Sequence, residues 1–345
     1  MKVNKKGLAI VLISVLLACS LTGCKEKEVE TEVTEEKKIQ IGMCFDTFVI
    51  ERWERDRDVF VSTANELGAE VDVQNPNGNV DEQISAIEYF IEKKVDVIVV
   101  VPIDCAAITE VINRARSNGI KVIAYDRLVT GVDLDLYISF DNEAVGSLMA
   151  SSVSEKLIPG DRIVMLCGPE TDNNVEQVKD GFIESAKSYG FEIEDCVNLD
   201  EWKSELAYQY VSENIDMIKN DVKAIMCGND NLASQVIYAL SENRLAGKIV
   251  VTGQDADLDA CQRIAEGTQY STVYKPVNLL ASQAAHSAVD LALGKGLVYD
   301  GKINNGWADI PYIRLEPTLV TAENMDETVI KDGFHQADEI YINIR

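Results

Sequence analysis

The sequence predicts an α/β protein of two lobes, each built on a parallel sheet that is doubly wound, with helices on both faces. Three observations predict it. Short β-branched runs alternate with longer amphipathic segments, the alternation runs through two successive sets of similar size, and 345 residues are too many for one ordinary core. Alternation indicates parallel pairing because two parallel neighbours need a crossover between them, which is usually a helix.

The first set contains four predicted strands, at 38–43, 69–73, 95–101 and 120–125. The segments between them have helical apolar spacing, at 50–67, 79–93 and 104–118. In the second of these segments, Ile84, Ile87 and Ile91 recur on one helical face. Gly68 and Gly119 stand where helix C-terminal caps belong, so each predicts the end of a helix.

The second set contains five predicted strands, at 162–167, 191–197, 222–227, 248–253 and 268–274. One helix-length stretch separates each from the next, and no linker separates the two sets. In open α/β sheets, ligands bind outside the carboxyl ends of the strands. The residues directly after each predicted strand are therefore the first candidates for a functional site.

The N-terminus predicts export. Three lysines precede an uncharged apolar run at 7–18, which is too short to cross a bilayer and indicates a signal peptide over residues 1–23. The run ends in LTGC at 21–24, which resembles the bacterial lipobox. That resemblance implies cleavage before Cys24, attachment of lipid to Cys24, and an extracytoplasmic protein anchored to the membrane.

A charged segment follows Cys24. The sequence KEKEVETEVTEEKK (25–38) contains six glutamates and four lysines and cannot build a core. Residues 24–38 are therefore expected to form a lipidated, solvated tether. A flexible chain of this length would reach roughly 20 Å.

The charge of the chain excludes some partners. Its formal net charge is -26, and removal of the three signal-peptide lysines lowers this to -29. Nucleic acid and anionic lipid are therefore poor partners for the folded surface. The remaining cysteines show no CxxC pair and no zinc-like spacing, which favours buried free thiols over a disulfide framework. They are Cys44, Cys105, Cys167, Cys196, Cys227 and Cys261.

Polar side chains capable of paired hydrogen bonds gather after the predicted strands. They are Arg52, Asp126, Arg127, Asp172, Asn174, Asn229, Asp255 and Lys275. A sugar hydroxyl both donates and accepts, so a sugar site needs carboxylates together with Asn, Arg or Lys, and this set has both kinds. Trp53 and Trp202 offer flat apolar partners for the C–H faces of a sugar ring, one from each lobe. The pattern predicts a site for a small sugar.

Several longer motifs resemble the D-xylose-binding family of bacterial ABC transporters. They are ERWERDRDVF (51–60), VQNPNGN (73–79), IKVIAYDR (120–127), YISFDNEAVG (137–146), VTGQDADL (251–258), RIAEGTQYSTVYKP (263–276) and TVIKDGFH (328–335). The resemblance implies a type I periplasmic binding protein fold whose lobes are joined by a three-segment hinge. It places the sugar ligands on the eight polar residues above, with Trp53 and Trp202 stacking on the ring. The segments 168–174 and around Trp202 resemble the family only in part.

The resemblance also implies an organisation and a role. We expect the first lobe over 39–140 and 275–306, the second over 141–274 and 307–345, and hinge segments near Phe140, Tyr274 and Trp307. The protein would capture a monosaccharide, with D-xylose the leading ligand, and deliver it to an ABC permease. It would act as a monomer with no cofactor, no metal and no enzymatic activity.

The sequence leaves other interpretations of the partner, the sugar and some single residues open. A receptor kinase or chemoreceptor could replace the permease as partner, and a glucose- or arabinose-preferring relative would keep most of the same residues. Asn229 could be only a helix cap, and Asp126 with Arg127 only an ion pair. Asp255, Asp257 and Asp259 have calcium-loop spacing but lack the loop glycine, and they suit a helix N-terminus better.

Two further functions are disfavoured. His286 and His335 lie far from the strand exits and from any plausible nucleophile, which argues against a hydrolytic enzyme. A transcriptional effector domain could share the fold, but the predicted signal peptide and the lack of a helix-turn-helix pattern argue against it.

Overall fold

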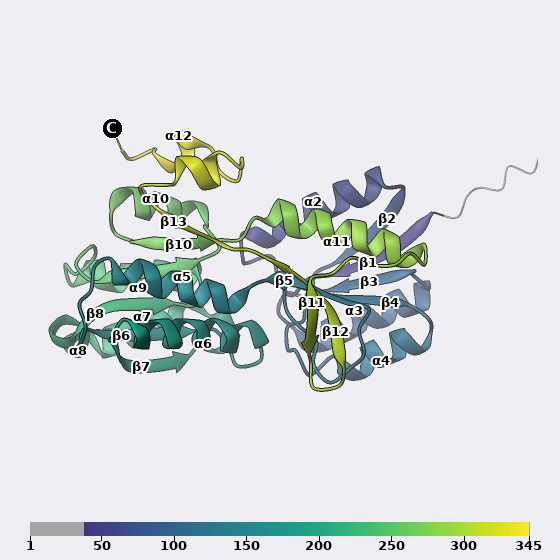
Figure 1. Cartoon of the computed structure of the whole chain (residues 1–345), viewed down its shortest axis with the longest axis horizontal. Coiled ribbons are helices and arrows are strands. Elements are labelled where there is room, and N and C mark those ends of the chain that lie inside the picture. Colours follow the sequence, from purple (N-terminus) through teal and green to yellow (C-terminus); the bar gives the residue numbers. More distant parts are fainter. Residues whose placement is uncertain (1–37, 345) are drawn as a thin grey trace, which may run out of the picture. The chain divides into compact units, whose positions relative to one another are not determined.

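The computed structural model describes residues 38–344. The predicted signal peptide, Cys24 and the tether up to residue 37 lie outside these residues. Within them the chain forms two β-sheets, and helices flank each sheet (Figure 1). The predicted α/β class with two doubly wound lobes is confirmed, with the difference that each sheet carries one antiparallel pairing at an edge.

The first sheet has seven strands in the order β11-β12-β5-β4-β3-β1-β2. Its strands are β1 (Ile39–Cys44), β2 (Ala69–Gln74), β3 (Val97–Val100), β4 (Lys121–Tyr125), β5 (Leu136–Phe140), β11 (Gly301–Asn304) and β12 (Asp309–Leu315). All neighbours pair in parallel except β11 and β12, which form a hairpin. The helices of this lobe are α2 (Arg52–Glu66), α3 (Val80–Lys93), α4 (Thr109–Ser117) and α11 (Val277–Ala292).

The second sheet has six strands in the order β13-β10-β9-β8-β6-β7. Its strands are β6 (Arg162–Cys167), β7 (Glu192–Asn198), β8 (Val222–Cys227), β9 (Val250–Gln254), β10 (Ser271–Tyr274) and β13 (Thr318–Thr321). Only β13 runs antiparallel to its neighbour. The helical segments here are α5 (Asn142–Ser154), α6 (Asn173–Ser188), η1 (Asp200–Trp202), α7 (Ser204–Glu213), α8 (Ile215–Asp221), α9 (Asp230–Glu242), α10 (Leu258–Glu266), η2 (Asp326–Ile330) and α12 (Ala337–Ile340).

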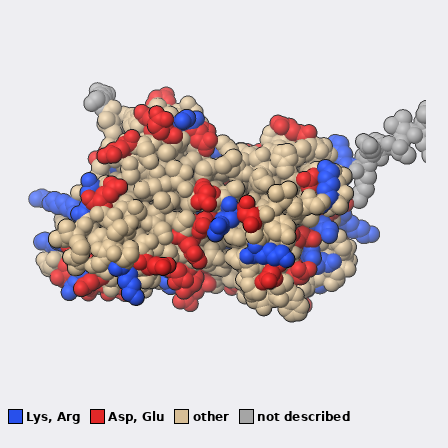
Figure 2. All heavy atoms as spheres, in the orientation of Figure 1, with Lys and Arg blue, Asp and Glu red and all other residues tan. Residues whose placement is uncertain are grey.

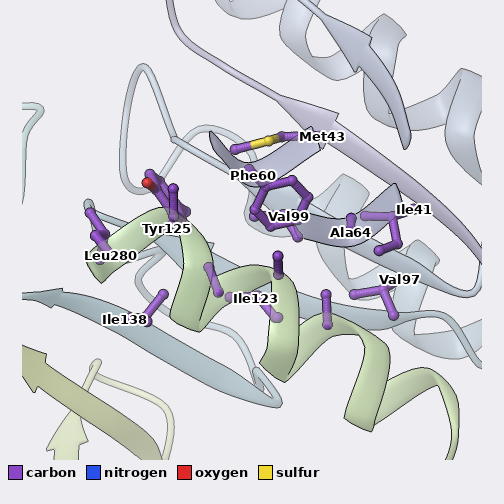
Figure 3. Close-up of a cluster of buried hydrophobic side chains, with 14 of the residues drawn as sticks. Ile41, Met43, Phe60, Ala64, Val97, Val99, Ile123, Tyr125, Ile138 and Leu280 are labelled. Carbon is purple, nitrogen blue, oxygen red and sulfur yellow. The ribbon is translucent and has the colours of Figure 1, made fainter. Parts of the chain in front are cut away.

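The central strands are buried on both faces. In the first lobe, α2 and α11 cover one face of the sheet, where Met43, Phe60, Val99, Ile123 and Leu280 pack together (Figure 3). A second buried cluster on the other face joins the sheet to α3 and α4. Burial on both faces explains why the strands are almost continuously apolar in sequence. Each large apolar side chain contributes about 1.5–3 kcal/mol when fully buried.

Helix ends follow the signals in the sequence. The Asn79 side chain accepts a hydrogen bond from the amide of Glu82 at 3.1 Å and caps α3. Gly68 and Gly119 follow α2 and α4 with φ of +84° and +82°. Glycine adopts this left-handed conformation at little cost, so these two residues end their helices as predicted.

The chain passes between the sheets three times. The first crossing lies between β5 and α5, the second between β10 and α11, and the third between β12 and β13. We expected the third crossing near Trp307, and this was wrong. Because β12 pairs in parallel with β5, residues 309–315 belong to the first sheet. Trp307 is 70% exposed in the connection between β11 and β12.

The six cysteines of the described region are all free. Four are buried, Cys105 is half-buried and Cys196 is exposed, so the expectation of buried free thiols holds for four of the six. No helix between residues 38 and 344 is long and apolar enough to cross a membrane. On the face seen in Figure 2, lysines and arginines lie in small groups between acidic side chains.

Candidate ligand-binding site

Asp126 and Arg127 follow β4 directly, at the carboxyl edge of the first sheet. Asp126 has a φ of +62°, a left-handed conformation that costs a non-glycine residue roughly 1–2 kcal/mol. Its carbonyl accepts hydrogen bonds from the hydroxyls of Ser139 at 2.6 Å and Tyr137 at 3.0 Å. Its amide donates to the carbonyl of Ile138 at 2.8 Å. These bonds to β5 hold the backbone of Asp126 in place.

In the second lobe, two of the predicted residues are helix caps. Asp172 caps α6 by accepting from the amide of Asn174 at 3.0 Å, and Asn229 caps α9 by accepting from the amide of Leu232 at 2.9 Å. The capping interpretation of Asn229 is therefore correct, yet both caps also line the cavity described next. A helix N-terminus directed at this edge of the sheet favours polar and anionic groups.

All ten side chains predicted to bind the ring come together around one cavity between the lobes. They are Arg52, Trp53, Asp126, Arg127, Asp172, Asn174, Trp202, Asn229, Asp255 and Lys275. About 500 Å³ between these lining residues is not filled by protein atoms, a volume that includes space open to solvent. Nine of the ten are buried and Trp202 is half-buried, so the site is largely closed to solvent.

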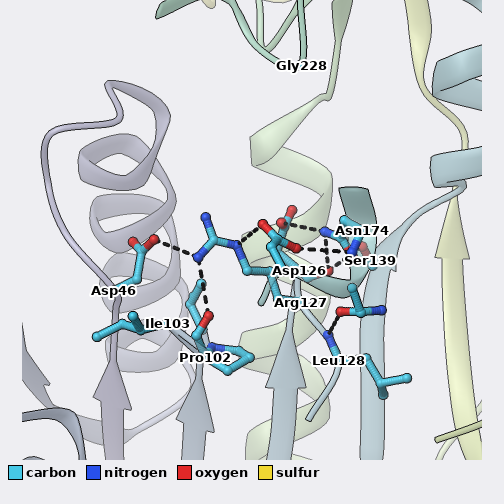
Figure 4. A network of polar contacts seen from close by, with 12 residues as sticks. Asp46, Pro102, Ile103, Asp126, Arg127, Leu128, Ser139, Asn174 and Gly228 are labelled. Atoms are coloured by element: carbon cyan, nitrogen blue, oxygen red, sulfur yellow. Dashed lines mark hydrogen bonds and ion pairs between the residues drawn. The ribbon is translucent and has the colours of Figure 1, made fainter. Parts of the chain in front are cut away.

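Arg127 links the two lobes inside this cavity. Its Nη1 lies 2.7 Å from Asp46 Oδ2 of the first lobe and donates to the Pro102 carbonyl at 3.2 Å (Figure 4). Its Nε lies 2.7 Å from Asp172 Oδ2 of the second lobe. With two acceptors from its own lobe and one from the other, the guanidinium is fixed in direction.

Arg52 and Lys275 form a second linkage. Arg52 Nη1 lies 3.0 Å from Asp126 Oδ2 and 3.8 Å from Asp255 Oδ1, which belongs to the other lobe. Its Nε lies 3.3 Å from Asp56 Oδ2. Lys275 Nζ approaches Asp255 Oδ1 to 3.3 Å. Cations and carboxylates thus alternate around the cavity wall.

The pKa values of two cavity carboxylates are shifted in opposite directions. Burial alone would raise the pKa of Asp126, but the positive charges of Arg52 and Lys275 outweigh burial and lower it. For Asp172 burial prevails over the nearby Arg127 charge, so its pKa is raised. Asp126 is therefore the more firmly ionised acceptor of the two.

Four buried side-chain polar atoms in the described part of the chain lack a hydrogen-bond partner, and all four belong to cavity residues. They are Trp53 Nε1, Trp202 Nε1, Gln254 Oε1 and Asp255 Oδ1. Asp255 Oδ1 lies within ion-pair distance of Lys275 but accepts no hydrogen bond. Each unpartnered buried atom costs about 1–3 kcal/mol. Two donors and two acceptors are thus available to a ligand that offers both.

Two glycines make room for Trp202. A Cβ at Gly168 would lie 2.3 Å from the indole of Trp202, and a Cβ at Gly228 would lie 3.2 Å from it. The ring therefore packs directly over the backbone at the ends of β6 and β8. Sequence reasoning did not predict that either glycine makes room for Trp202, although each follows a cysteine at a strand end.

Other lining residues were not among the ten predicted. Gln254 stands beside Asp255, and its Oε1 is one of the unpartnered atoms. The apolar wall is formed by Ile50, Val175, Val178 and Met226. Asn173, which we did not predict to touch ligand, is absent from the lining, and its side chain accepts from the Leu128 amide at 2.8 Å.

The described residues offer little for other chemistry. No group of three His, Cys, Asp or Glu side chains among residues 38–344 could hold a metal ion. The calcium-like aspartates lie around the start of α10, as the helix interpretation expected. His335 bonds to the Ala256 carbonyl through Nε2 at 2.8 Å and does not line the cavity.

The chain is similar to a known domain family and to named proteins. Residues 41–296 match the model of the periplasmic binding protein domain. The chain is 40% identical over 324 residues to the D-xylose-binding periplasmic protein of Escherichia coli K12, covering 93% of this chain and 98% of that protein. It is 41% identical over 312 residues to the D-xylose-binding periplasmic protein of Haemophilus influenzae, covering 88% and 93%.

Solved structures match the fold over most of the chain. An ABC transporter solute-binding protein from Clostridium phytofermentans with bound β-D-glucose aligns with a TM-score of 0.80 at 27% identity, covering 87% of this chain and 99% of that one. The family match and these relatives make the chain a solute-binding protein, a class that is not enzymatic. The chain belongs to the periplasmic binding protein family, among its sugar-binding members, and has the type I fold of that family.

Proposed function

We propose that this protein captures one monosaccharide outside the cytoplasm, with D-xylose preferred, and delivers it to the permease of an ABC transporter. The observation that carries the proposal is the cavity between the lobes, whose lining residues hold all four unpartnered buried polar side-chain atoms of the described chain. A monosaccharide offers several hydroxyls, each able to donate and to accept a hydrogen bond.

The wall chemistry supports a sugar over an ion or a nucleotide. Carboxylates of Asp126, Asp172 and Asp255 accept hydrogen bonds from hydroxyls, while arginine, lysine and asparagine side chains donate. Trp53, Trp202 and the apolar wall would cover the C–H faces of the ring. About six charge-assisted hydrogen bonds of roughly 1.5–3 kcal/mol each, less the ordering costs, allow the roughly -8 kcal/mol of a micromolar complex.

The preference for D-xylose is supported by the two relatives named for that sugar, at 40% and 41% identity over nearly the whole chain. The relative that holds β-D-glucose is more distant, at 27% identity. Glucose differs from xylose by one hydroxymethyl group, so local bulk in the cavity decides between them.

Closure would be the working step. Arg52, Asp126 and Arg127 belong to the first lobe, whereas Asp172 and Asp255 belong to the second. A sugar that bonds to both sets binds the closed state better than the open one, and this difference in affinity shifts the lobe equilibrium. The three crossings between the sheets would absorb the rotation.

We also propose that the protein is a lipoprotein attached through Cys24. The support is the sequence alone: an apolar run of signal-peptide length, the LTGC motif and the charged tether. Lipid at Cys24 would keep the binding lobes near the membrane that holds the permease.

Isothermal titration of the purified protein with a panel of pentoses and hexoses tests the function. We expect D-xylose to bind at micromolar concentration and at least about tenfold more tightly than glucose or arabinose. Tighter glucose binding would move the preference to hexoses, and no binding of any sugar would contradict the proposal.

Transport needs a cellular test. Deletion of the gene should abolish uptake of labelled xylose. Expression of the gene from a plasmid should restore the uptake. Unchanged uptake combined with a lost response to xylose would contradict the transport role and support docking on a sensory receptor.

A further inference from the structure

We propose that Arg55 and Glu51, beside the sugar-facing start of α2, form a latch that stabilises the closed state and sets sugar affinity without touching the sugar. This inference rests on the proposed function. The α2 latch is defined as these two side chains with the second-lobe backbone groups that they contact, at Leu258, Gly333 and Phe334.

Arg55 makes three contacts with the C-terminal segment. Its Nη1 donates to the carbonyl of Phe334 at 2.6 Å and to the carbonyl of Gly333 at 3.3 Å. Its guanidinium carbon lies 4.8 Å from the centre of the Phe334 ring. A charged donor on backbone carbonyls, with a cation–π contact beside it, is a stabilising combination for a half-buried arginine.

The two sides of these contacts belong to different lobes. Arg55 lies on α2, whose Phe60 and Ala64 are buried in the core of the first lobe. Phe334 is 5% exposed and packs in a core with Val320 of β13 in the second lobe. Its ring also packs against Tyr274 of β10 in a tilted arrangement, with 4.9 Å between ring centres. Opening of the lobes therefore separates Arg55 from its acceptors.

Glu51 adds a second contact from the same end of α2. Its Oε2 accepts from the amide of Leu258 at 3.3 Å, and Leu258 is the first residue of α10 in the second lobe. The first amides of a helix have no partner within the helix, so a carboxylate from the other lobe satisfies one of them.

Neither latch residue lines the cavity, although Arg52 and Trp53 between them do. One helix therefore presents ligand-facing residues beside residues that contact the other lobe. Contacts made only in the closed state raise the fraction of closed protein, and apparent affinity scales with that fraction. The latch should therefore change the dissociation constants of all sugars by the same factor.

Arg55→Ala tests the latch, with Arg57→Ala as the matched control. Arg57 lies on the same helix, and its guanidinium carbon is 5.1 Å from the Phe48 ring centre. It pairs with Asp58 at 2.7 Å, so these contacts stay within the first lobe. We expect Arg55→Ala to raise the dissociation constant of D-xylose about tenfold and Arg57→Ala to leave it unchanged.

A second sugar from the panel distinguishes a latch from a pocket residue. Arg55→Ala should weaken both sugars by the same factor, and small-angle scattering at a fixed subsaturating xylose concentration should show a larger mean radius of gyration. Unequal factors for the two sugars, or an unchanged dissociation constant, would overturn the latch.

Two further measurements distinguish a folding defect from loss of the latch, and failure of the latch from failure of the proposed function. If Arg55→Ala does not fold, as judged by its thermal unfolding transition, Arg55→Lys replaces it and is expected to weaken both sugars severalfold. An Arg55→Lys protein with wild-type affinity for both would overturn the latch. Wild-type protein that binds no sugar would contradict the proposed function, and wild-type binding with unchanged variants would contradict the latch alone.

Discussion

Asp126 and Asp255 hold corresponding positions in the two lobes. Each follows a central strand, β4 or β9, and each has a positive φ, +62° and +96°. Each amide donates to the next strand, to the Ile138 carbonyl at 2.8 Å and to the Val273 carbonyl at 2.9 Å. Backbone strain of this kind concentrates at functional sites, which supports a binding role for both carboxylates.

Asp255→Asn isolates the charge of one of these carboxylates, because asparagine tolerates the left-handed backbone. We expect D-xylose binding to weaken by about 2 kcal/mol, since a buried charged acceptor is lost. Titration calorimetry measures the change. Asp259→Asn, on the exposed first turn of α10, is the control and should bind normally. Equal affinities for the two variants would remove Asp255 from the ligand set.

Cys167 and Cys196 form a thiol pair beside the cavity. They lie on the neighbouring strands β6 and β7, and Cys167 lines the cavity while Cys196 is exposed. The hydrogen bond from the Cys167 thiol, helped by the charge of Lys179, lowers the pKa of Cys196 to about 7. For the buried Cys227 thiol, burial raises the pKa well above its usual value.

Among the six cysteines of residues 38–344, Cys196 should therefore be the thiol that iodoacetamide labels first. The thiolate is the reactive form, so labelling of Cys196 should rise steeply as the pH passes through about 7. Peptide mapping by mass spectrometry at a series of pH values locates the label. Earlier labelling of half-buried Cys105, or no rise until the pH exceeds 8.5, the ordinary thiol value, would contradict the expectation.

At the scale of elements, α5 and α6 approach each other closely through two glycines. A Cβ at Gly146 would lie 2.0 Å from the Val178 carbonyl oxygen, and one at Gly181 would lie 2.0 Å from the Glu143 carbonyl oxygen. Neither contact leaves space for a methyl group. Asp172, the N-cap residue of α6, lies at the cavity. The close packing of α6 against α5 therefore also holds Asp172 in position.

Gly181→Ala should destabilise the protein by about 1–3 kcal/mol, because the added methyl group forces the two helices apart. Gly296→Ala is the control, since a Cβ there meets no atom within 4 Å. Urea unfolding followed by circular dichroism gives the free energy of unfolding for both. A Gly181→Ala protein as stable as the control would show that the helices can separate without cost.

The sequence predicted nine of the strands of residues 38–344 and missed four. Strands β1 to β4 and β6 to β10 match the predicted runs, although β7 is mostly exposed. Strand β5 was missed although all five of its residues are buried. Strands β11, β12 and β13 have mixed burial and therefore a weak pattern. The third crossing, which the resemblance placed near Trp307, lies after Leu315 because β12 pairs with β5.

The site could be predicted from the sequence where a charged or polar residue directly follows a predicted strand. All ten predicted residues line the cavity. Those that directly follow parallel strands do so because such residues converge on one edge of the sheet. Gly168 and Gly228 could not be predicted in the same way, since their role depends on how closely the Trp202 ring approaches the backbone. Only the tertiary packing reveals that distance.

At the scale of the whole molecule, closure should be visible in solution. Small-angle scattering is expected to show a smaller radius of gyration when D-xylose is added, because the sugar binds both lobes. A sugar that fails to bind in the titration panel is the control and should leave the profile unchanged. Identical profiles with and without a tightly bound sugar would contradict closure.

Membrane attachment gives a second prediction at this scale. Cys24→Ala should release the protein from the membrane fraction while xylose affinity stays the same, since Cys24 precedes the lobes that bind sugar. Membrane fractionation with a high-salt wash and immunoblotting measures the release. Retention of Cys24→Ala on washed membranes would contradict attachment through this cysteine.

The three crossings also determine when the protein can fold. The core of the first lobe includes α11, and its sheet includes β12, yet both are synthesised after most of the second lobe. The second sheet in turn is complete only with β13. Both lobes are therefore completed within residues 309–321, close to the C-terminus. A nascent chain of this kind remains incompletely folded until translation is almost finished, which keeps it able to thread through an export channel.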